Sequence, residues 1–85
     1  MPYINQDDRE RAKTKPVTAG ELNYAITMMI QDYIKQSGGV SYRIMNEVTG
    51  VLECCKLELY RKITSKYEDI KIYENGDVFT LDITN

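Results

Sequence analysis

The chain has 85 residues, with 11 basic and 13 acidic side chains, two cysteines and no histidine. This length predicts a single domain, residues 1–85, whose own core buries only about 60–65% of the unfolded surface. Without histidine, Ser-His and Cys-His catalytic pairs are excluded, and two cysteines fall short of a structural zinc site. We therefore expect no catalytic residues, no metal and no cofactor.

The two cysteines also bear on oligomeric state. Domains this small usually gain stability from disulfides, a metal or a partner. Cys54 and Cys55 are adjacent, and neighbouring cysteines do not normally bridge each other. We therefore expect a homo-oligomer. Free thiols fit a reducing cytoplasm, and no apolar run approaches the ~20 residues that span a bilayer, so we expect a cytoplasmic protein without membrane contact.

Residues 1–17 predict an N-terminal arm. The segment 7–13 begins with acids and ends with bases, which suits the dipole of a short helix. It has almost no apolar face, and Tyr3 and Ile4 are its only hydrophobic anchors. We expect the arm to fray unless it docks.

Residues 18–36 predict the first long helix. Thr18 and Glu21 have the spacing of a capping box, and the glycines after Ser37 are typical of a helix C-terminus. Apolar side chains then recur on one helical face at Leu22, Ala25, Ile26, Met29, Tyr33 and Ile34.

Residues 41–66 predict a second, longer helix that forms an antiparallel helical hairpin with the first. Its apolar seam steps by three and four, which places Cys55 in the seam and Cys54 beside it as packing residues. The seam consists of Met45, Val48, Leu52, Cys55 and Leu59. Gly50 lies inside this helix, either as a tolerated glycine or to let another helix approach closely.

The charges are unevenly distributed: residues 41–67 are net basic and residues 68–85 are net acidic. The two stretches could simply be solvated faces of opposite charge, or one end of a subunit could attract the opposite end of a neighbouring subunit.

Residues 69–83 predict a C-terminal β-hairpin. Asn75-Gly76 is the favoured pair for a two-residue type I′ turn. A turn centred there places Ile70, Ile72, Phe79 and Leu81 on one face. The expected fold is therefore α+β, mostly α: a short arm, a helical hairpin with a long second helix and a C-terminal β-hairpin, assembled as an oligomer.

One polar stripe suggests a ligand site. Glu53, Lys56 and Tyr60 share a face of the second helix, with Arg61 beside them, and the first helix carries Asn23, Tyr24 and Thr27. A tyrosine to stack, cations for phosphate and an amide would suit a small anionic or nucleotide-like ligand. The alternative is a surface lattice of ion pairs with amphipathic tyrosines. The candidate ligand-binding residues are Asn23, Tyr24, Lys56, Tyr60 and Arg61.

Three segments, GELNYAIT (20–27), GVLECCKLELYRK (50–62) and YEDIKIYENGDVF (67–79), resemble a family of short phage and prophage proteins of unknown function. The resemblance implies a phage-encoded protein in the bacterial cytoplasm. Our leading hypothesis is a non-enzymatic homo-oligomer that sequesters a small phosphorylated ligand, such as a host defence signal. The alternatives are an adaptor that inhibits a host protein and, less favoured, a virion structural or assembly component. Nucleic acid fits poorly, because the pI is about 5.0.

Overall fold

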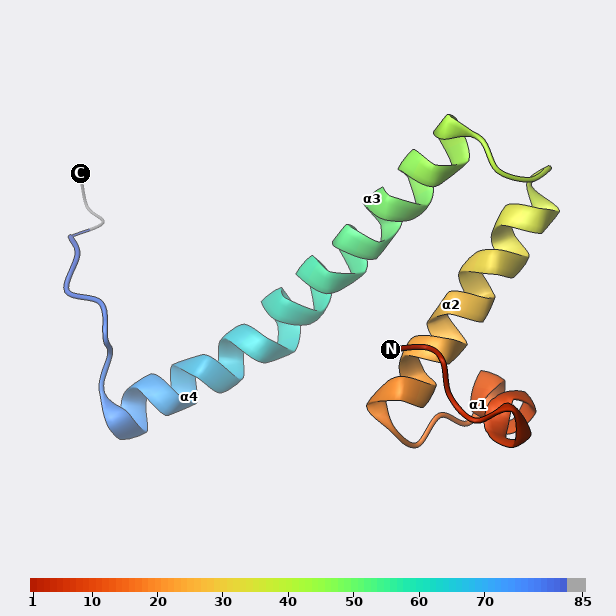
Figure 1. The fold of residues 1–85 in the computed structure, drawn as a ribbon. Helices are drawn as coiled ribbons and strands as arrows, with labels where there is room; N and C mark the ends of the chain where they lie inside the picture. The colour runs from red at the N-terminus through yellow and green to blue at the C-terminus, as the bar shows by residue number, and fades with distance from the viewer. Residues whose placement is uncertain (83–85) are drawn as a thin grey trace. The chain divides into compact units, whose positions relative to one another are not determined.

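The computed structural model describes residues 1–82, and its contacts divide the chain into two units. The N-terminal unit is Met1–Val48, and the C-terminal unit begins at Thr49. Figure 1 shows a succession of helices. They are the 3-10 turn η1 (Gln6–Asp8), α1 (Arg9–Thr14), α2 (Ala19–Gln36), α3 (Tyr42–Leu59), the π-helical turn η2 (Tyr60–Thr64) and α4 (Ser65–Asn75).

Helix α2 begins and ends with the signals that its sequence predicts. The Thr18 side chain accepts a hydrogen bond from the Glu21 N–H at 3.1 Å, which confirms the predicted N-cap. At the other end Gly38 and Gly39 have positive φ, and the Gly39 N–H donates to the Ile34 carbonyl at 2.9 Å. This long bond back into the last turn is a Schellman motif, which satisfies carbonyls that the helix leaves without partners.

The arm docks on α2. Ala12 of α1 is fully buried, and the Arg9 guanidinium lies 5.7 Å from the centre of the Tyr24 ring. Of the two expected anchors, Ile4 is partly buried and Tyr3 is exposed. The Cγ2 atom of Ile4 lies 3.5 Å from the point that a Cβ at Gly20 would occupy. The arm is therefore held mainly by α1 and by polar contacts rather than by its two N-terminal apolar residues.

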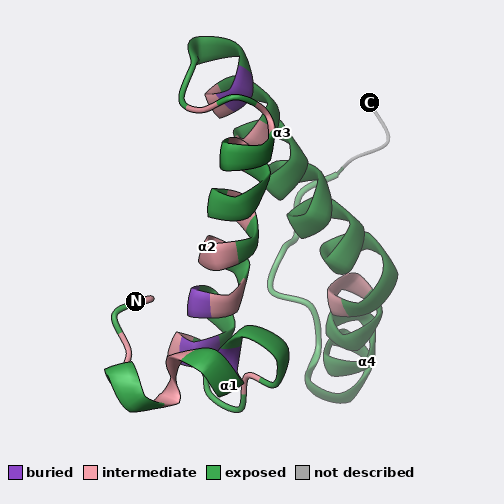
Figure 2. Ribbon diagram, turned by 90° about the vertical axis from the view of Figure 1, so that its right-hand side faces the viewer, coloured by how far each residue is buried: buried purple, intermediate pink, exposed green. Residues whose placement is uncertain are grey.

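The core of the N-terminal unit is small. Its buried apolar residues are Ala12, Tyr24 and Ile44, and Glu21 is buried with them. Figure 2 shows these buried positions on α1, on α2 and near the beginning of α3. Ile44 is only 2% exposed, and its N–H donates to the Ser41 hydroxyl at 3.2 Å. Ser41 therefore caps α3 at the predicted starting point.

In the C-terminal unit, α3, η2 and α4 follow one another without a break to Asn75. No residue between Thr49 and Asp82 is buried, and only Thr64 and Ser65 are even partly covered. The unit thus consists of helix and the segment after it, with no hydrophobic core of its own among the described residues.

The predicted C-terminal β-hairpin, and with it the α+β fold class, is wrong. Residues 69–75, expected as the first strand and the start of the turn, form the end of α4. No residue up to Asp82 is in a strand, and residue 83 of the expected hairpin lies outside the described residues. Gly76 has φ +86°, and its N–H donates to the Ile72 carbonyl at 2.8 Å. The Asn-Gly pair therefore ends a helix instead of turning a hairpin, since both structures need positive φ at the glycine.

Most of the residues predicted to form the seam of the helical hairpin are exposed. Met45 and Val48 are partly covered, but Leu52 and Leu59 are exposed. Both cysteines are exposed too, so the prediction that they pack in the seam is not met within one chain. Between α2 and the first turns of α3, the Tyr33 hydroxyl donates to Glu47 at 3.5 Å.

Candidate interaction surface

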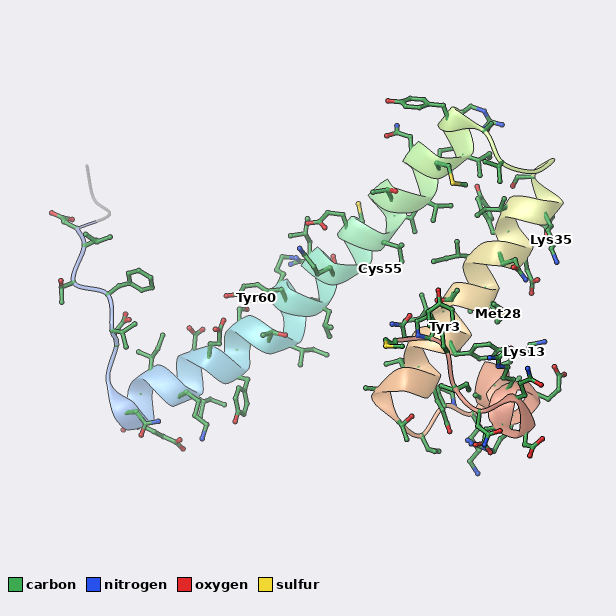
Figure 3. The ribbon with its side chains drawn as sticks, in the orientation of Figure 1. Tyr3, Lys13, Met28, Lys35, Cys55 and Tyr60 are labelled. Atoms are coloured by element: carbon green, nitrogen blue, oxygen red, sulfur yellow. The ribbon has the colours of Figure 1, made fainter. Side chains whose placement is uncertain are left out.

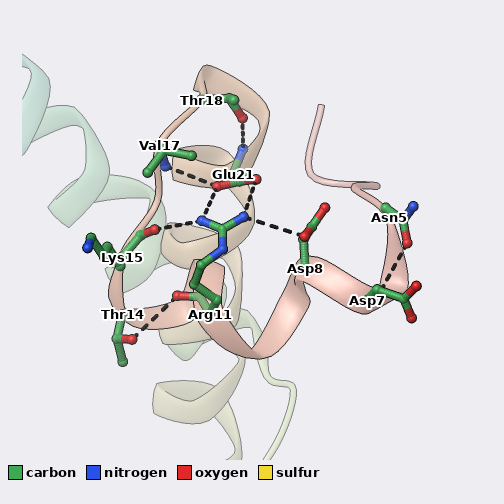
Figure 4. A network of polar contacts seen from close by, with 9 residues as sticks. All are labelled: Asn5, Asp7, Asp8, Arg11, Thr14, Lys15, Val17, Thr18 and Glu21. Carbon is green, nitrogen blue, oxygen red and sulfur yellow. Dashed lines mark hydrogen bonds and ion pairs between the residues drawn. The ribbon is translucent and has the colours of Figure 1, made fainter.

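A polar clamp fastens the arm to the first turn of α2 (Figure 4). The Arg11 guanidinium donates to both carboxylate oxygens of Glu21, at 2.8 and 2.7 Å, and to the Lys15 carbonyl at 3.0 Å. The Val17 N–H donates to the same carboxylate at 3.0 Å. A forked pair of this kind fixes both the distance and the angle between the two segments.

The clamp shifts the titration of both partners. The hydrogen bonds from Arg11 and from the Val17 N–H hold the pKa of Glu21 below its usual range. The same bond to Glu21 raises the pKa of Arg11. The capping-box spacing pointed to Glu21 as a residue near the helix start, but its partner ten residues earlier left no sequence signal, because the clamp depends on how the arm folds back.

Two of the predicted ligand residues lie on α2 in the N-terminal unit. Tyr24 is buried beneath Arg9, so its ring is already stacked against a cation of the same chain. Asn23 is exposed and accepts a hydrogen bond from the Thr27 hydroxyl at 3.2 Å. The structure thus gives Tyr24 a role in the core, and Asn23 a local contact.

The other three predicted ligand residues stand on the long helix of the C-terminal unit, where Figure 3 shows the Tyr60 side chain. Lys56 pairs with Glu53 at 3.2 Å, and Arg61 pairs with Glu58 at 2.8 Å. The Tyr60 hydroxyl donates to Glu68 at 2.5 Å. These contacts match the alternative of a surface ion-pair lattice; binding of a ligand by the five residues stays a prediction.

The Tyr60–Glu68 bond shows that the π turn changes which side chains share a face of the helix. Eight residues along a regular α-helix turn the side chain about 80° away from the starting face. The π turn adds one residue to a turn, as shown by the Ser65 N–H, which bonds the Tyr60 carbonyl five residues back. Tyr60 and Glu68 therefore come onto one face, and the bond to Glu68 raises the pKa of the tyrosine. Sequence reasoning missed this turn.

The same phase shift aligns an apolar surface. Leu59 and Tyr67 are also eight residues apart across η2, so they share a face as Tyr60 and Glu68 do. We call this surface the apolar stripe; it consists of Leu52, Cys55, Leu59, Ile63, Tyr67 and Ile70, all exposed. A strict heptad would lose this face at η2, and the extra residue restores it.

A groove lies on another face of α4. It has a volume of about 460 Å³ and runs between the helix and the segment after Gly76, with Ile72, Val78 and Phe79 among its apolar walls. Glu68, already bonded to Tyr60, is one of its polar lining groups. The groove shares none of the residues that form the apolar stripe, so the segment after α4 leaves the stripe uncovered.

Metal-binding groups and membrane-spanning helices are absent from the described residues. Residues 1–82 contain no group of three or more histidine, cysteine, aspartate or glutamate side chains placed to hold a metal ion. In the same range, no helix combines the length and the apolar character that crossing a bilayer requires. The feature that stands out chemically is the apolar stripe.

Comparison with known proteins gives a family without an assigned activity. No curated protein and no solved structure matches the chain. One family matches residues 1–78, which is nearly the whole chain, and it includes both the arm and the long helix. The chain belongs to this family, which is described as a domain of unknown function, DUF6899.

Proposed function

We propose that this protein is a non-catalytic assembly protein that associates with itself through the apolar stripe. The observation that carries the proposal is the absence of any buried residue between Thr49 and Asp82, although the helix there carries a continuous row of large apolar side chains. Burying one such side chain is worth about 1.5–3 kcal/mol, so a helix with an uncovered row gains much from a partner.

The core of the N-terminal unit gives a second argument for the same proposal. Its arm, clamp and capped helix α2 form a compact unit, with its core among α1, α2 and the start of α3. On α3, the buried residue of that core is Ile44, in the first turn of the helix. The exposed apolar residues after Val48 support a role for this helix as an association surface.

The test compares two leucines of α3 in sedimentation equilibrium. Leu57 and Leu59 are both 56% exposed, but they lie about 200° apart around the helix. Only Leu59 belongs to the apolar stripe. Leu59→Gln removes a leucine from each copy in the interface, and we expect the dissociation constant to rise about a hundredfold.

Leu57→Gln is the matched control, with the same chemistry, exposure and helix. We expect it to leave the association constant within about threefold of the wild type, since surface substitutions usually change free energies by about 0.5 kcal/mol or less. Two results would refute the proposal. One is an equal effect of the two substitutions, and the other is a wild-type protein that stays monomeric at concentrations up to about 1 mM.

The finer hypotheses are tested on the same assembly. Sequestration of a phosphorylated, nucleotide-like ligand during phage infection rests on the sequence pattern around Lys56, Tyr60 and Arg61. Calorimetry with a panel of cyclic nucleotides, on the wild type and on Arg61→Gln, measures it directly. Heat of binding that Arg61→Gln abolishes would support ligand binding, and no heat with any nucleotide would end that hypothesis without touching self-association.

A further inference from the structure

We propose that Asn75 is a site of spontaneous deamidation, and that the last turn of α4 controls how fast this modification occurs. Asn75 is the last residue of α4 and is followed by Gly76, and both residues are exposed. Neither residue belongs to the apolar stripe, so this chemistry is independent of the proposed self-association.

The reaction needs no enzyme and no co-reactant other than water. The Gly76 backbone nitrogen gives up its proton and attacks the side-chain amide carbon of Asn75. A C–N bond forms to close a succinimide ring, and the side-chain nitrogen leaves as ammonia with that proton. Water then opens the ring at either carbonyl, which leaves aspartate or isoaspartate at position 75. No electrons are gained or lost, so no oxidant or reductant takes part.

Asn75 is the asparagine among residues 1–82 that suits this reaction. A side chain on the following residue crowds the attacking nitrogen, and glycine has none. The Asn75 side chain is exposed, and no hydrogen bond holds it within the described part of the chain. The other asparagines of this range precede larger residues, in the pairs Asn5-Gln6, Asn23-Tyr24 and Asn46-Glu47.

The last turn of α4 holds the pair in an unreactive geometry. The Gly76 N–H donates to the Ile72 carbonyl at 2.8 Å, so the attacking nitrogen is engaged and does not readily lose its proton. The helical backbone at Asn75 also directs this nitrogen along the helix rather than back toward the Asn75 side chain. Ring closure therefore requires the last turn to open. Helix ends open at little cost in free energy, so the turn slows the reaction without preventing it.

Deamidation changes the end of α4 irreversibly. Isoaspartate, the usual main product of this chemistry, adds an extra atom to the backbone before Gly76 and so displaces the N–H that bonds Ile72. Either product also puts a negative charge at the C-terminal end of a helix, which the helix dipole disfavours. The closest base in the sequence, Lys71, is already paired with Glu74 at 3.2 Å. Because Asn75 and Gly76 line the groove, the modification alters the groove together with the last turn.

The experiment compares deamidation with hydrogen exchange at the same turn. The full chain and an unstructured reference peptide of residues 73–79 are incubated side by side, and mass spectrometry measures deamidation and isoaspartate at position 75. Both reactions need the Gly76 N–H released from Ile72. The factor by which the protein slows deamidation should therefore match, within about threefold, the factor by which it slows exchange of that amide.

Three results would overturn the proposal. The first is an Asn75 that stays intact although the Gly76 amide exchanges as fast as in the peptide. The second is deamidation as fast as in the peptide while that amide is protected. The third is deamidation at Asn5, Asn23 or Asn46 that equals the rate at Asn75.

Tyr73→Pro isolates the role of the helix. Tyr73 is 91% exposed, and proline breaks the last turn without changing the Asn75-Gly76 pair. We expect this variant to deamidate at the rate of the peptide. Tyr73→Ala is the matched control and should stay within about twofold of the wild type, since alanine is a good helix former. Equal rates in the two variants would show that the last turn does not control the reaction.

Sedimentation separates this chemistry from self-association. Position 75 lies outside the apolar stripe, so we expect fully deamidated protein to associate as the wild type does. A wild type that sediments as a monomer would overturn the proposed function and leave the deamidation at Asn75 unaffected.

Discussion

Ile44→Ala probes whether the small N-terminal core holds that unit together. Ile44 is 2% exposed and is one of the three buried apolar residues of the N-terminal unit. Truncating a buried isoleucine to alanine costs about 2–5 kcal/mol. We expect the lower half of this range, about 2–3 kcal/mol, because the partly covered neighbours Met45 and Val48 can move into the space.

This loss is large for a unit of this size. At about 0.05–0.15 kcal/mol per residue, residues 1–48 have a free energy of unfolding of about 2–7 kcal/mol. Hydrogen exchange under native conditions measures it locally, and we expect α1 and α2 to lose protection by about thirty- to a hundredfold.

Ile26→Ala is the matched control, since Ile26 is 42% exposed on α2. We expect it to cost less than about 1 kcal/mol, partly offset by the higher helix propensity of alanine. Both variants are compared at a concentration below the dissociation constant of any dimer, so that assembly does not mask the difference. An Ile44→Ala variant as well protected as Ile26→Ala would show that the core we describe does not hold the unit.

Three further predictions concern the clamp and the helix backbone. Because the pKa of Glu21 is lowered in the folded state, its stabilising contribution is fully present above the ordinary carboxyl value of 4.5 and is lost as the pH falls through the folded pKa. Acid titration followed by exchange in α1 should show this loss. Arg11→Met should weaken the dependence, with the part due to the Val17 N–H remaining; an unchanged profile would contradict the clamp. Gly50→Ala should stabilise the helix by about 1 kcal/mol in circular dichroism, since a Cβ at Gly50 meets nothing within 4 Å. Gly76→Ala should lower the stability of the last turn of α4 by about 1 kcal/mol, because Gly76 has φ +86°. Exchange of the amide at position 76, which donates to the Ile72 carbonyl, measures this loss in both proteins.

The parts of the fold that sequence predicted well are those governed by local chemistry. Three signals act on backbone groups within a few residues: the hydroxyl of Thr18, the paired glycines after Ser37 and the hydroxyl of Ser41. Their positions indicate where α2 begins, where it ends and where α3 begins. The Arg11–Glu21 clamp joins segments that the local pattern does not place together. Its formation depends on the path of the chain around Lys15-Pro16.

The error at the C-terminus has a physical cause. Asn75-Gly76 favours positive φ in both a hairpin turn and a helix end, so the pair itself does not decide between them. The preceding residues favour the helix, because η2 and α4 continue an existing helix. Extending a helix costs much less free energy than nucleating a new structure. A two-stranded ribbon is only marginally stable without further packing. The apolar alternation of residues 70–73 was therefore overridden by the helix that precedes it.

The π turn connects this error to the association surface. A π turn interrupts the regular hydrogen-bond ladder of a helix, and in η2 the Arg61 carbonyl accepts a hydrogen bond from the Ser65 hydroxyl at 2.8 Å. Among the described residues, the turn allows the exposed hydrogen bond between Tyr60 and Glu68. Its other effect is to hold Leu59 and Tyr67 on one face, and that has value only when something packs against the face. The local irregularity therefore supports the proposed self-association through the apolar stripe.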